Sequence, residues 1–318
     1  MPHLLYSFLR ALLPRSGNVE ELPRGLTTSL EGVAFDRTLL ARYCSITHTP
    51  LEESAVPILF PHAMLFPVQC QLLTHSTVPV GVIGSVHSRN HIIQYRPLKC
   101  TDTFDVKATL CDGRRRPQGF EIDLVQDIMI DGSVIWRSVS TVLVRRPFAV
   151  HDPEGTLAAS IPAAKAASVR QCVGHFSVPA NTGRAFAQLT KDHNPIHMSS
   201  VLARLLYGFK RDLAHGMWAM ARALSLIGGV DPKAPVRLDC AFKGPIYMEN
   251  DARVESSGEC VFVHSGANAR PSIVARWRNV DPHKELLVGV PDAVPRSHAA
   301  SAACETAAPP ASVLPSKL

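Results

Sequence analysis

A repeated order of elements constrains the fold of this chain more than any other feature of its sequence. In the second half, residues 217–227 (MWAMARALSLI) are almost entirely apolar and precede Gly228 and Gly229, which predicts a buried helix with a glycine stop. In the first half, residues 62–73 (HAMLFPVQCQLL) form a comparable apolar helix, which Pro67 should kink. Strand-like stretches follow each helix, at 82–98, 103–111, 120–130 and 133–145 in the first half and at 236–247, 252–263 and 272–280 in the second.

The two halves can be aligned with each other. His62-Ala63-Met64 matches His215-Gly216-Met217 at the start of the two helices, and Pro97-Leu98 matches Pro245-Ile246 further along. Asp131-Gly132, between two alternating stretches, indicates a hairpin. A helix followed by an antiparallel meander, twice over, predicts an α+β fold of two fused domains. Each would have a central helix wrapped by an antiparallel sheet, and the two sheets could join edge to edge.

Composition marks the domain boundaries. Residues 147–172 are rich in Ala and Pro without hydrophobic periodicity, which is typical of a linker. Ala, Pro and Ser dominate residues 293–318, as in a disordered tail. The prediction is an N-terminal helical segment (1–24), a first domain (25–150), a linker (151–169), a second domain (170–291) and the tail (292–318).

Charge and cysteine usage exclude several classes of protein. The 33 Lys and Arg residues against 27 Asp and Glu residues give a formal net charge of +6, which suits an anionic small ligand. No basic tract with interleaved aromatic residues suggests nucleic acid binding. No uncharged apolar run reaches the ~18 residues that span a bilayer. The eight cysteines lack metal-ligand spacing, so we expect reduced thiols in an intracellular protein.

One stretch carries a candidate acid/base pair. Asn194 is a good N-cap and Pro195 fits the first position of a helix, which places Asp192 in the preceding loop and His197 in the first turn. The positive end of the helix dipole disfavours an imidazolium, so His197 should be neutral and able to accept a proton. A carboxylate and a neutral imidazole that share a water form a plausible acid/base pair.

A second feature lies at the start of the buried helix, at Ala214-His215-Gly216-Met217. Backbone N–H groups of a first helical turn lack intrahelical partners, and glycine allows close approach to the backbone. A carbonyl oxygen that gains negative charge would be stabilised there. We assign His215 a structural role beside the glycine, and ordinary core or surface roles to His62, His87, His91 and His193.

These residues resemble the signature of the MaoC-like dehydratases and R-specific enoyl-CoA hydratases (hydratase 2) of the hot-dog fold, in the double hot-dog form. The signature runs D-x-N-P-[IL]-H, A-x4-G-[FY] and A-H-G-[ML]. Its residues here are Asp192, Asn194, Pro195, Ile196 and His197, then Ala203, Gly208 and Phe209, then Ala214, His215, Gly216 and Met217. The resemblance covers about residues 30–290, because Phe242, Lys243 and Pro245 continue it and residues 86–98 look like the first half of double hot-dog members.

The resemblance implies hydration of a trans-2-enoyl thioester to a (3R)-3-hydroxyacyl thioester, or the reverse dehydration, in fatty acid metabolism. Asp192 and His197 would be the catalytic pair, Asn194 would support the loop, and the Gly216 N–H would receive the thioester oxygen. No metal or other cofactor is implied, and the substrate would be carried by coenzyme A or acyl carrier protein. One departure is Lys191, since members usually have Ser-Gly before the Asp.

The first half lacks the pair, because residues 43–50 contain no Asp five residues before a His. We therefore expect one active site per chain and a degenerate first domain that shapes an acyl-chain cavity. Lys210, Arg211 and Lys243 are candidate partners for coenzyme A phosphates. The run at 114–116 (RRR) is interpreted as a solvated hairpin loop. Two other functions stay open, a thioesterase and a non-catalytic acyl-thioester-binding subunit, and so does a homodimer.

The final tripeptide, Ser316-Lys317-Leu318, matches the S-K-L address read by the peroxisomal import receptor. Exposure on a disordered tail would favour this recognition, so we expect a peroxisome or a related organelle. The alternative is a mitochondrion, because residues 1–19 contain Arg but no acidic residue.

Overall fold

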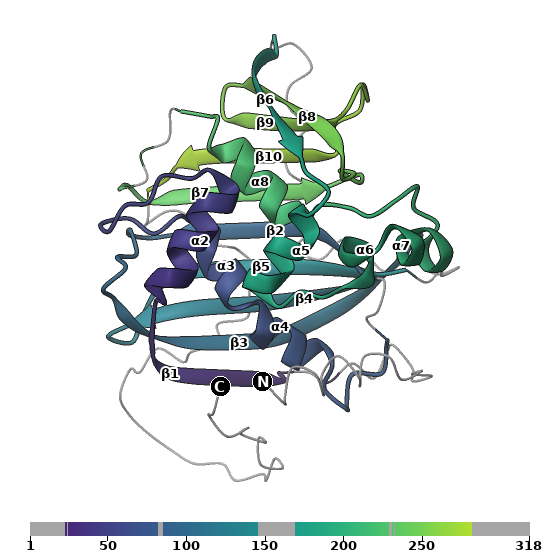
Figure 1. Cartoon of the computed structure of the whole chain (residues 1–318). Helices are drawn as coiled ribbons and strands as arrows, with labels where there is room; N and C mark the ends of the chain where they lie inside the picture. The colour runs from purple at the N-terminus through teal and green to yellow at the C-terminus, as the bar shows by residue number, and fades with distance from the viewer. Residues whose placement is uncertain are drawn as a thin grey trace.

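The computed structural model describes residues 23, 25–81, 85–145, 169–228, 231 and 233–281. Ten strands form a single antiparallel sheet, and helices cover one face of it (Figure 1). In the first half these elements are β1 (Thr27–Ala34), α2 (Arg37–Thr47), α3 (Phe60–Met64), α4 (Phe66–Leu73), β2 (Val86–Gln94), β3 (Thr103–Arg116), β4 (Gly119–Ile130) and β5 (Ser133–Val144).

The second half repeats the arrangement. Its elements are β6 (Gln171–Val178), α5 (Thr182–Thr190), α6 (Pro195–Met198), α7 (Ser200–Tyr207), α8 (Gly216–Leu224), β7 (Val236–Phe242), β8 (Asn250–Ser257), β9 (Cys260–Ser265) and β10 (Ile273–Asn279). The strand order across the sheet is β1-β3-β4-β5-β2-β7-β10-β9-β8-β6. Counted from the outer edge of the sheet toward its middle, the strands of the two halves follow the same order. The second strand of each half, β2 or β7, forms the junction.

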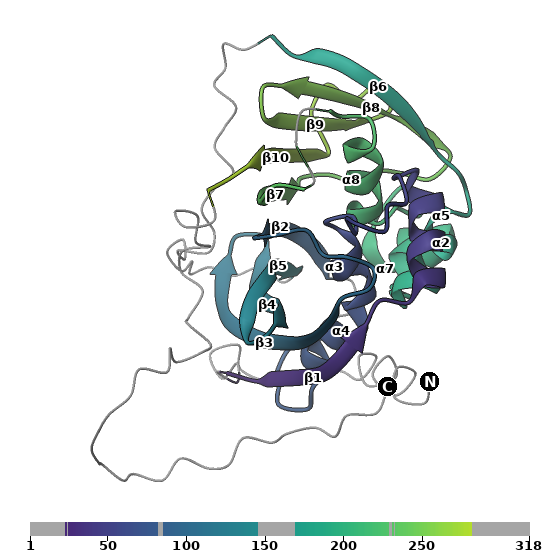
Figure 2. The same cartoon turned by 90° about the vertical axis from the view of Figure 1, so that its left-hand side faces the viewer.

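The junction is the antiparallel pair β2–β7, in which Arg89 lies opposite Ala241 and Gln94 opposite Val236. The sheet curves around the helices, with α3 and α4 against the first half and α8 against the second (Figure 2). One large apolar core runs through both halves, and Ile93, Val125 and Val139 form a small separate cluster. The predicted pair of helix-in-sheet domains joined edge to edge is confirmed.

Local signals explain several elements. The β4–β5 hairpin turns at Asp131 (φ 51°) and Gly132 (φ 72°), and the left-handed conformation of both residues is the one that an Asp-Gly turn favours. The expected helix over 62–73 is two short helices that meet at Leu65. Each begins with a proline in its first turn, Pro61 or Pro67, where a missing N–H costs nothing.

Two predictions about strands were wrong. Residues 252–263 form a hairpin rather than one strand, because Gly258 turns the chain at φ 57° between β8 and β9. The run at 114–116 lies in β3 rather than in a solvated loop. Arg114 is buried and donates to Asp123 at 2.9 Å, and Arg116 pairs with Glu121 at 3.2 Å. Buried carboxylates on β4 require cationic partners, and the neighbouring strand supplies them.

Other predictions lie outside the described residues. These are the N-terminal segment 1–24 apart from Pro23, the linker 151–169 apart from Val169, the tail 292–318 and the tripeptide Ser316-Lys317-Leu318. The boundaries predicted for the two domains stay predictions. Among the described residues, no helix is long and apolar enough to cross a membrane.

Candidate active site

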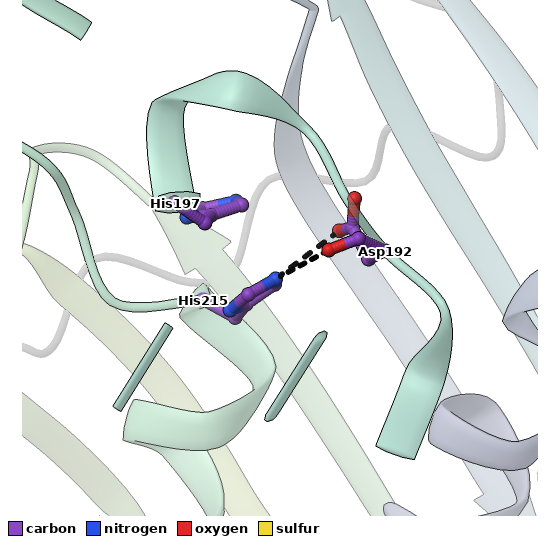
Figure 3. Close-up of side chains that lie close together, drawn as sticks. All are labelled: Asp192, His197 and His215. Atoms are coloured by element: carbon purple, nitrogen blue, oxygen red, sulfur yellow. Dashed lines mark hydrogen bonds and ion pairs between the residues drawn. The ribbon is translucent and has the colours of Figure 1, made fainter. Parts of the chain in front are cut away.

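Three side chains from separate segments converge in the second half (Figure 3). Asp192 lies in the loop after α5, His197 lies in α6, and His215 is the residue before α8. The predicted pair, Asp192 and His197, is brought together as expected. The third member, His215, was predicted to have a structural role beside Gly216, and that role stays a prediction; its contact with the pair was not predicted.

Several hydrogen bonds hold the loop that carries Asp192. Its backbone N–H donates to the Thr190 hydroxyl at 3.1 Å, and its Oδ1 accepts from the Asn194 N–H at 3.2 Å. Asn194 caps α6, since its Oδ1 accepts from the Ile196 N–H at 3.4 Å. The Asn194 amide also donates to the Ser85 carbonyl at 3.4 Å, which connects the loop to the first half. These contacts give Asn194 the supporting position that the sequence predicts.

His197 is held in one tautomer. Its Nδ1 lies 2.9 Å from the carbonyl of Leu213, which can only accept, so Nδ1 carries the proton and Nε2 is left as an acceptor. Burial lowers the pKa of His197, although the nearby Asp192 carboxylate raises it. The neutral imidazole agrees with the prediction, but burial rather than the dipole of the short helix α6 is the main cause.

Burial also raises the pKa of Asp192, while His197 and the Asn194 N–H lower it. The pKa of the Asp192 carboxyl is thus raised and the pKa of the His197 imidazole is lowered. The carboxyl holds a proton more readily than usual, and the imidazole holds one less readily. Perturbations of this kind are typical of groups that exchange protons during catalysis.

His215 contacts both members of the pair. Its ring stacks on His197 with centroids 3.7 Å apart, and its Nε2 lies 3.6 Å from Asp192 Oδ2. Burial, with the adjacent His197, lowers its pKa well below the ordinary value. Ligand-type atoms of the three residues lie within 4.8 Å of one another, a spacing at which they could hold a metal ion.

Gly216 begins α8 beside this cluster, where its N–H has no intrahelical partner. A Cβ atom at this position would lie 2.7 Å from two ring atoms of Phe242. Glycine therefore lets the Phe242 ring pack close to the start of the helix, where the Gly216 N–H has no intrahelical partner.

All of these residues line one cavity of about 670 Å³ between the two halves. The second half contributes the catalytic candidates with Phe186, Phe209, Met217 and Ile246, and the first half contributes residues of α3, α4, β2 and β5. Arg145 and Lys243 are exposed lining residues and form a cationic rim. Of the three cations predicted to bind phosphates, only Lys243 lines the cavity, and Arg211 instead pairs with Glu249.

Lys191, the departure from the family motif, occupies a backbone position that suits glycine. It ends α5 in the left-handed conformation (φ 63°), which a glycine adopts without steric cost. Its ammonium donates to the Gln188 carbonyl at 2.7 Å. The positive charge is thus held at the C-terminus of α5, where it complements the helix dipole.

The corresponding place in the first half holds no acid/base pair. There α2 ends at Thr47, and His48 takes the same left-handed conformation as Lys191. By this match Thr49 stands at the position of Asp192, and its hydroxyl lies 2.9 Å from the hydroxyl of Thr47. Within the described ranges, the cluster around Asp192 is the one group of three ligand-type residues.

Comparisons with known proteins agree with this geometry. The model of the "MaoC like domain" family matches residues 165–264. The chain is similar to 3-hydroxyacyl-thioester dehydratase X of Mycobacterium tuberculosis, with 30% identity over 252 residues, 78% of this chain and 86% of the relative. The crystal structure of HtdX from Mycobacterium tuberculosis superposes with a TM-score of 0.68 at 26% identity, covering 80% of this chain and all of that one.

A further structure supports the fold alone. A conserved hypothetical protein of Mycobacterium tuberculosis with a double hot-dog fold superposes with a TM-score of 0.54 at 14% identity, over 83% of this chain and 97% of that one. The strand order described above has the same two-fold repetition of a helix in a sheet.

Proposed function

This chain belongs to the family of MaoC-like dehydratases, and from that premise we propose that it hydrates trans-2-enoyl thioesters to (3R)-3-hydroxyacyl thioesters, or catalyses the reverse dehydration, in fatty acid metabolism. The observation that carries the proposal is the position of Asp192 and neutral His197 in one cavity with the free first turn of α8. The relative named a 3-hydroxyacyl-thioester dehydratase supports the same reaction class.

In the proposed hydration, one water lies between the Asp192 carboxylate and His197 Nε2. Nε2 is available because Nδ1 donates to the Leu213 carbonyl. As the water oxygen bonds to the β-carbon, its proton passes to the pair, and a proton from the pair is delivered to the α-carbon. The C=C bond becomes a single bond, so the elements of water are added without any oxidation or reduction.

The thioester oxygen gains negative charge during this addition. We place this oxygen at the Gly216 N–H, since the first turn of α8 presents an unpaired donor and the positive end of a helix dipole. His215 acts as a positioning residue: its ring packs flat on His197 and its Nε2 faces Asp192, so it restricts both side chains.

The bulky polar carrier, coenzyme A or acyl carrier protein, would stay at the exposed rim formed by Arg145 and Lys243. A cationic rim suits the phosphates of either carrier. The acyl chain would then extend toward the buried side of the cavity.

The test is loss of the conjugated-enoyl absorbance when purified protein is mixed with a trans-2-enoyl-CoA. Asp192→Asn and His197→Ala should each lower kcat by on the order of 10²–10⁴ while substrate binding is retained. The double variant should be little worse than either single one, because residues that act as a unit are not additive. Release of free thiol instead would indicate a thioesterase, and binding without turnover would indicate a non-catalytic subunit.

A further inference from the structure

A second cluster of polar side chains lines the same cavity from the first half and has no role in the hydration chemistry. It consists of His62 in α3, Gln69 in α4 and His87 in β2. The imidazole rings of His62 and His87 stack with centroids 5.3 Å apart and an interplanar angle of 11°. The other contact of the His87 ring is with Phe242, at 4.9 Å, and Phe242 is the residue that packs against Gly216.

Hydrogen bonds fix the tautomer of His62. The amide nitrogen of Gln69 lies 3.2 Å from His62 Nδ1 and can only donate, so Nδ1 is an acceptor and the proton is on Nε2. The orientation of the Gln69 amide is set in turn, because it also donates to Gln126 Oε1, while the Gln126 amide donates to the Leu65 carbonyl at 3.1 Å. His62 therefore offers an N–H donor from a rigid buried network.

His87 contributes the second polar atom. Its Nε2 is buried and has no hydrogen-bond partner within the described part of the chain. An unpartnered buried polar atom is costly, and it usually marks a position that a water or ligand fills.

Both rings are neutral. Burial lowers the pKa of His87 to about 4, and burial together with His87 lowers the pKa of His62 well below its ordinary value. The pair therefore presents the His62 Nε2–H and the unpartnered His87 Nε2 without a net charge. An anion would find no countercharge here, whereas a hydroxyl group can accept from one ring and donate to the other.

The cluster lies on the acyl side of the cavity. His62 and Gln69 are 4% and 3% exposed, and their neighbours in the lining, Ala63 and Leu73, are also buried, whereas Arg145 and Lys243 at the rim are exposed. With the carrier at the rim, the acyl chain is the part of the substrate that reaches α3 and α4.

We propose that His62 and His87 form a subsite for a hydroxyl group on the acyl chain, so that hydroxylated enoyl thioesters are preferred over unsubstituted ones. The inference rests on the proposed function and names its substrate class. The hydroxyl accepts from His62 Nε2–H and donates to His87 Nε2, while Gln69 acts as a positioning residue that keeps the His62 proton on Nε2. Apolar side chains such as Ala63, Phe66 and Leu73 enclose the rest of the chain.

The test compares kcat/KM for pairs of trans-2-enoyl-CoA substrates of equal length, one unsubstituted and one with a hydroxyl group at each carbon beyond the double bond in turn. For at least one position, wild-type protein should prefer the hydroxylated substrate by about tenfold or more, the discrimination expected from a buried hydrogen-bonding site. His87→Phe keeps the stacked ring but removes the acceptor, and His62→Phe removes the donor. Each should abolish the preference, measured as the ratio of kcat/KM for the hydroxylated and the unsubstituted substrate of the same variant.

Matched controls separate this inference from the proposed function. His175→Phe makes the same replacement on exposed strand β6, outside the cavity lining, and should leave the preference unchanged. Turnover of the unsubstituted substrate tests the hydratase itself. The subsite is disproved if active wild-type protein shows no preference at any position, or if the preference survives in both Phe variants. Should one Phe variant fail to fold, the other and Gln69→Leu, which should weaken the preference, give the answer.

Discussion

The contact between Gly216 and Phe242 makes a quantitative prediction. In Gly216→Ala the new Cβ would lie 2.7 Å from Phe242 Cδ1 and Cε1, closer than such atoms pack, so the ring must move. Forcing a methyl group into a packed site costs about 1–3 kcal/mol. Alanine in place of glycine in a helix returns about 0.5–1 kcal/mol, so the expected loss of unfolding free energy is at most about 2.5 kcal/mol.

Activity should fall further than stability. The new Cβ points at the Phe242 ring, which lines the cavity, so displacement of the ring changes the space beside the Gly216 N–H where the thioester oxygen would lie. We expect kcat/KM for an enoyl-CoA to fall on the order of tenfold or more, since each 1.4 kcal/mol in the transition state is a factor of ten.

A double-variant cycle isolates the contact. Phe242→Leu removes the ring atoms that the new Cβ would meet, so Gly216→Ala should be at least about 1 kcal/mol less destabilising in that background. Urea denaturation of the four proteins gives the coupling free energy, and enoyl hydration by the same samples gives the effect on catalysis. Additive effects on stability, within about 0.5 kcal/mol, would refute the packing argument.

Three further predictions follow from other features. Lys191→Gly should stabilise the protein by about 1 kcal/mol in thermal or chemical denaturation, because a non-glycine residue pays roughly that amount for the left-handed conformation; a loss of stability would show that the Lys191 contact with Gln188 matters more. Because burial raises the pKa of Asp192 and lowers that of His197, hydration should fall with decreasing pH as the Asp192 carboxylate takes up a proton, at a pH above the ordinary range of an aspartate. The residual activity of Asp192→Asn should lack this acid limb, and an unchanged pH profile would contradict the assignment. Finally, a reporter that carries residues 293–318 should enter peroxisomes; if the reporter stays cytosolic while one carrying the first 20 residues enters mitochondria, the mitochondrial alternative is correct.

The parts of the fold that could be predicted from sequence were those with strong local signals. The apolar run before Gly228 gave α8, and Asp131-Gly132 gave the β4–β5 hairpin, because both depend on residues close together in the chain. The split of residues 252–263 was missed because Gly258 alone looks like an interruption within a strand. The buried place of Arg114 could not be predicted, since it depends on carboxylates of the neighbouring strand β4.

The site shows the same distinction. Asp192 and His197 belong to one continuous motif, so their proximity follows from a single turn of chain. His215 lies 3.6 Å from Asp192 only because the fold brings the start of α8 next to the loop after α5. The stacking of His62 on His87 likewise requires α3 and β2 to lie side by side. The buried neutral state of these histidines comes from surroundings assembled by both halves, which no local pattern contains.

The covalent fusion of two similar halves at β2–β7 has an evolutionary consequence. In a symmetric dimer of single domains, every substitution appears twice, so a residue that helps one copy of the site must be tolerated in the other. Here the two copies vary separately. The first half could lose its acid/base pair, with Thr49 after the left-handed His48 where Asp192 follows Lys191, and the reaction in the second half would be unaffected. Fusion therefore allows substrate choice to be altered in one half while the reaction itself is preserved in the other.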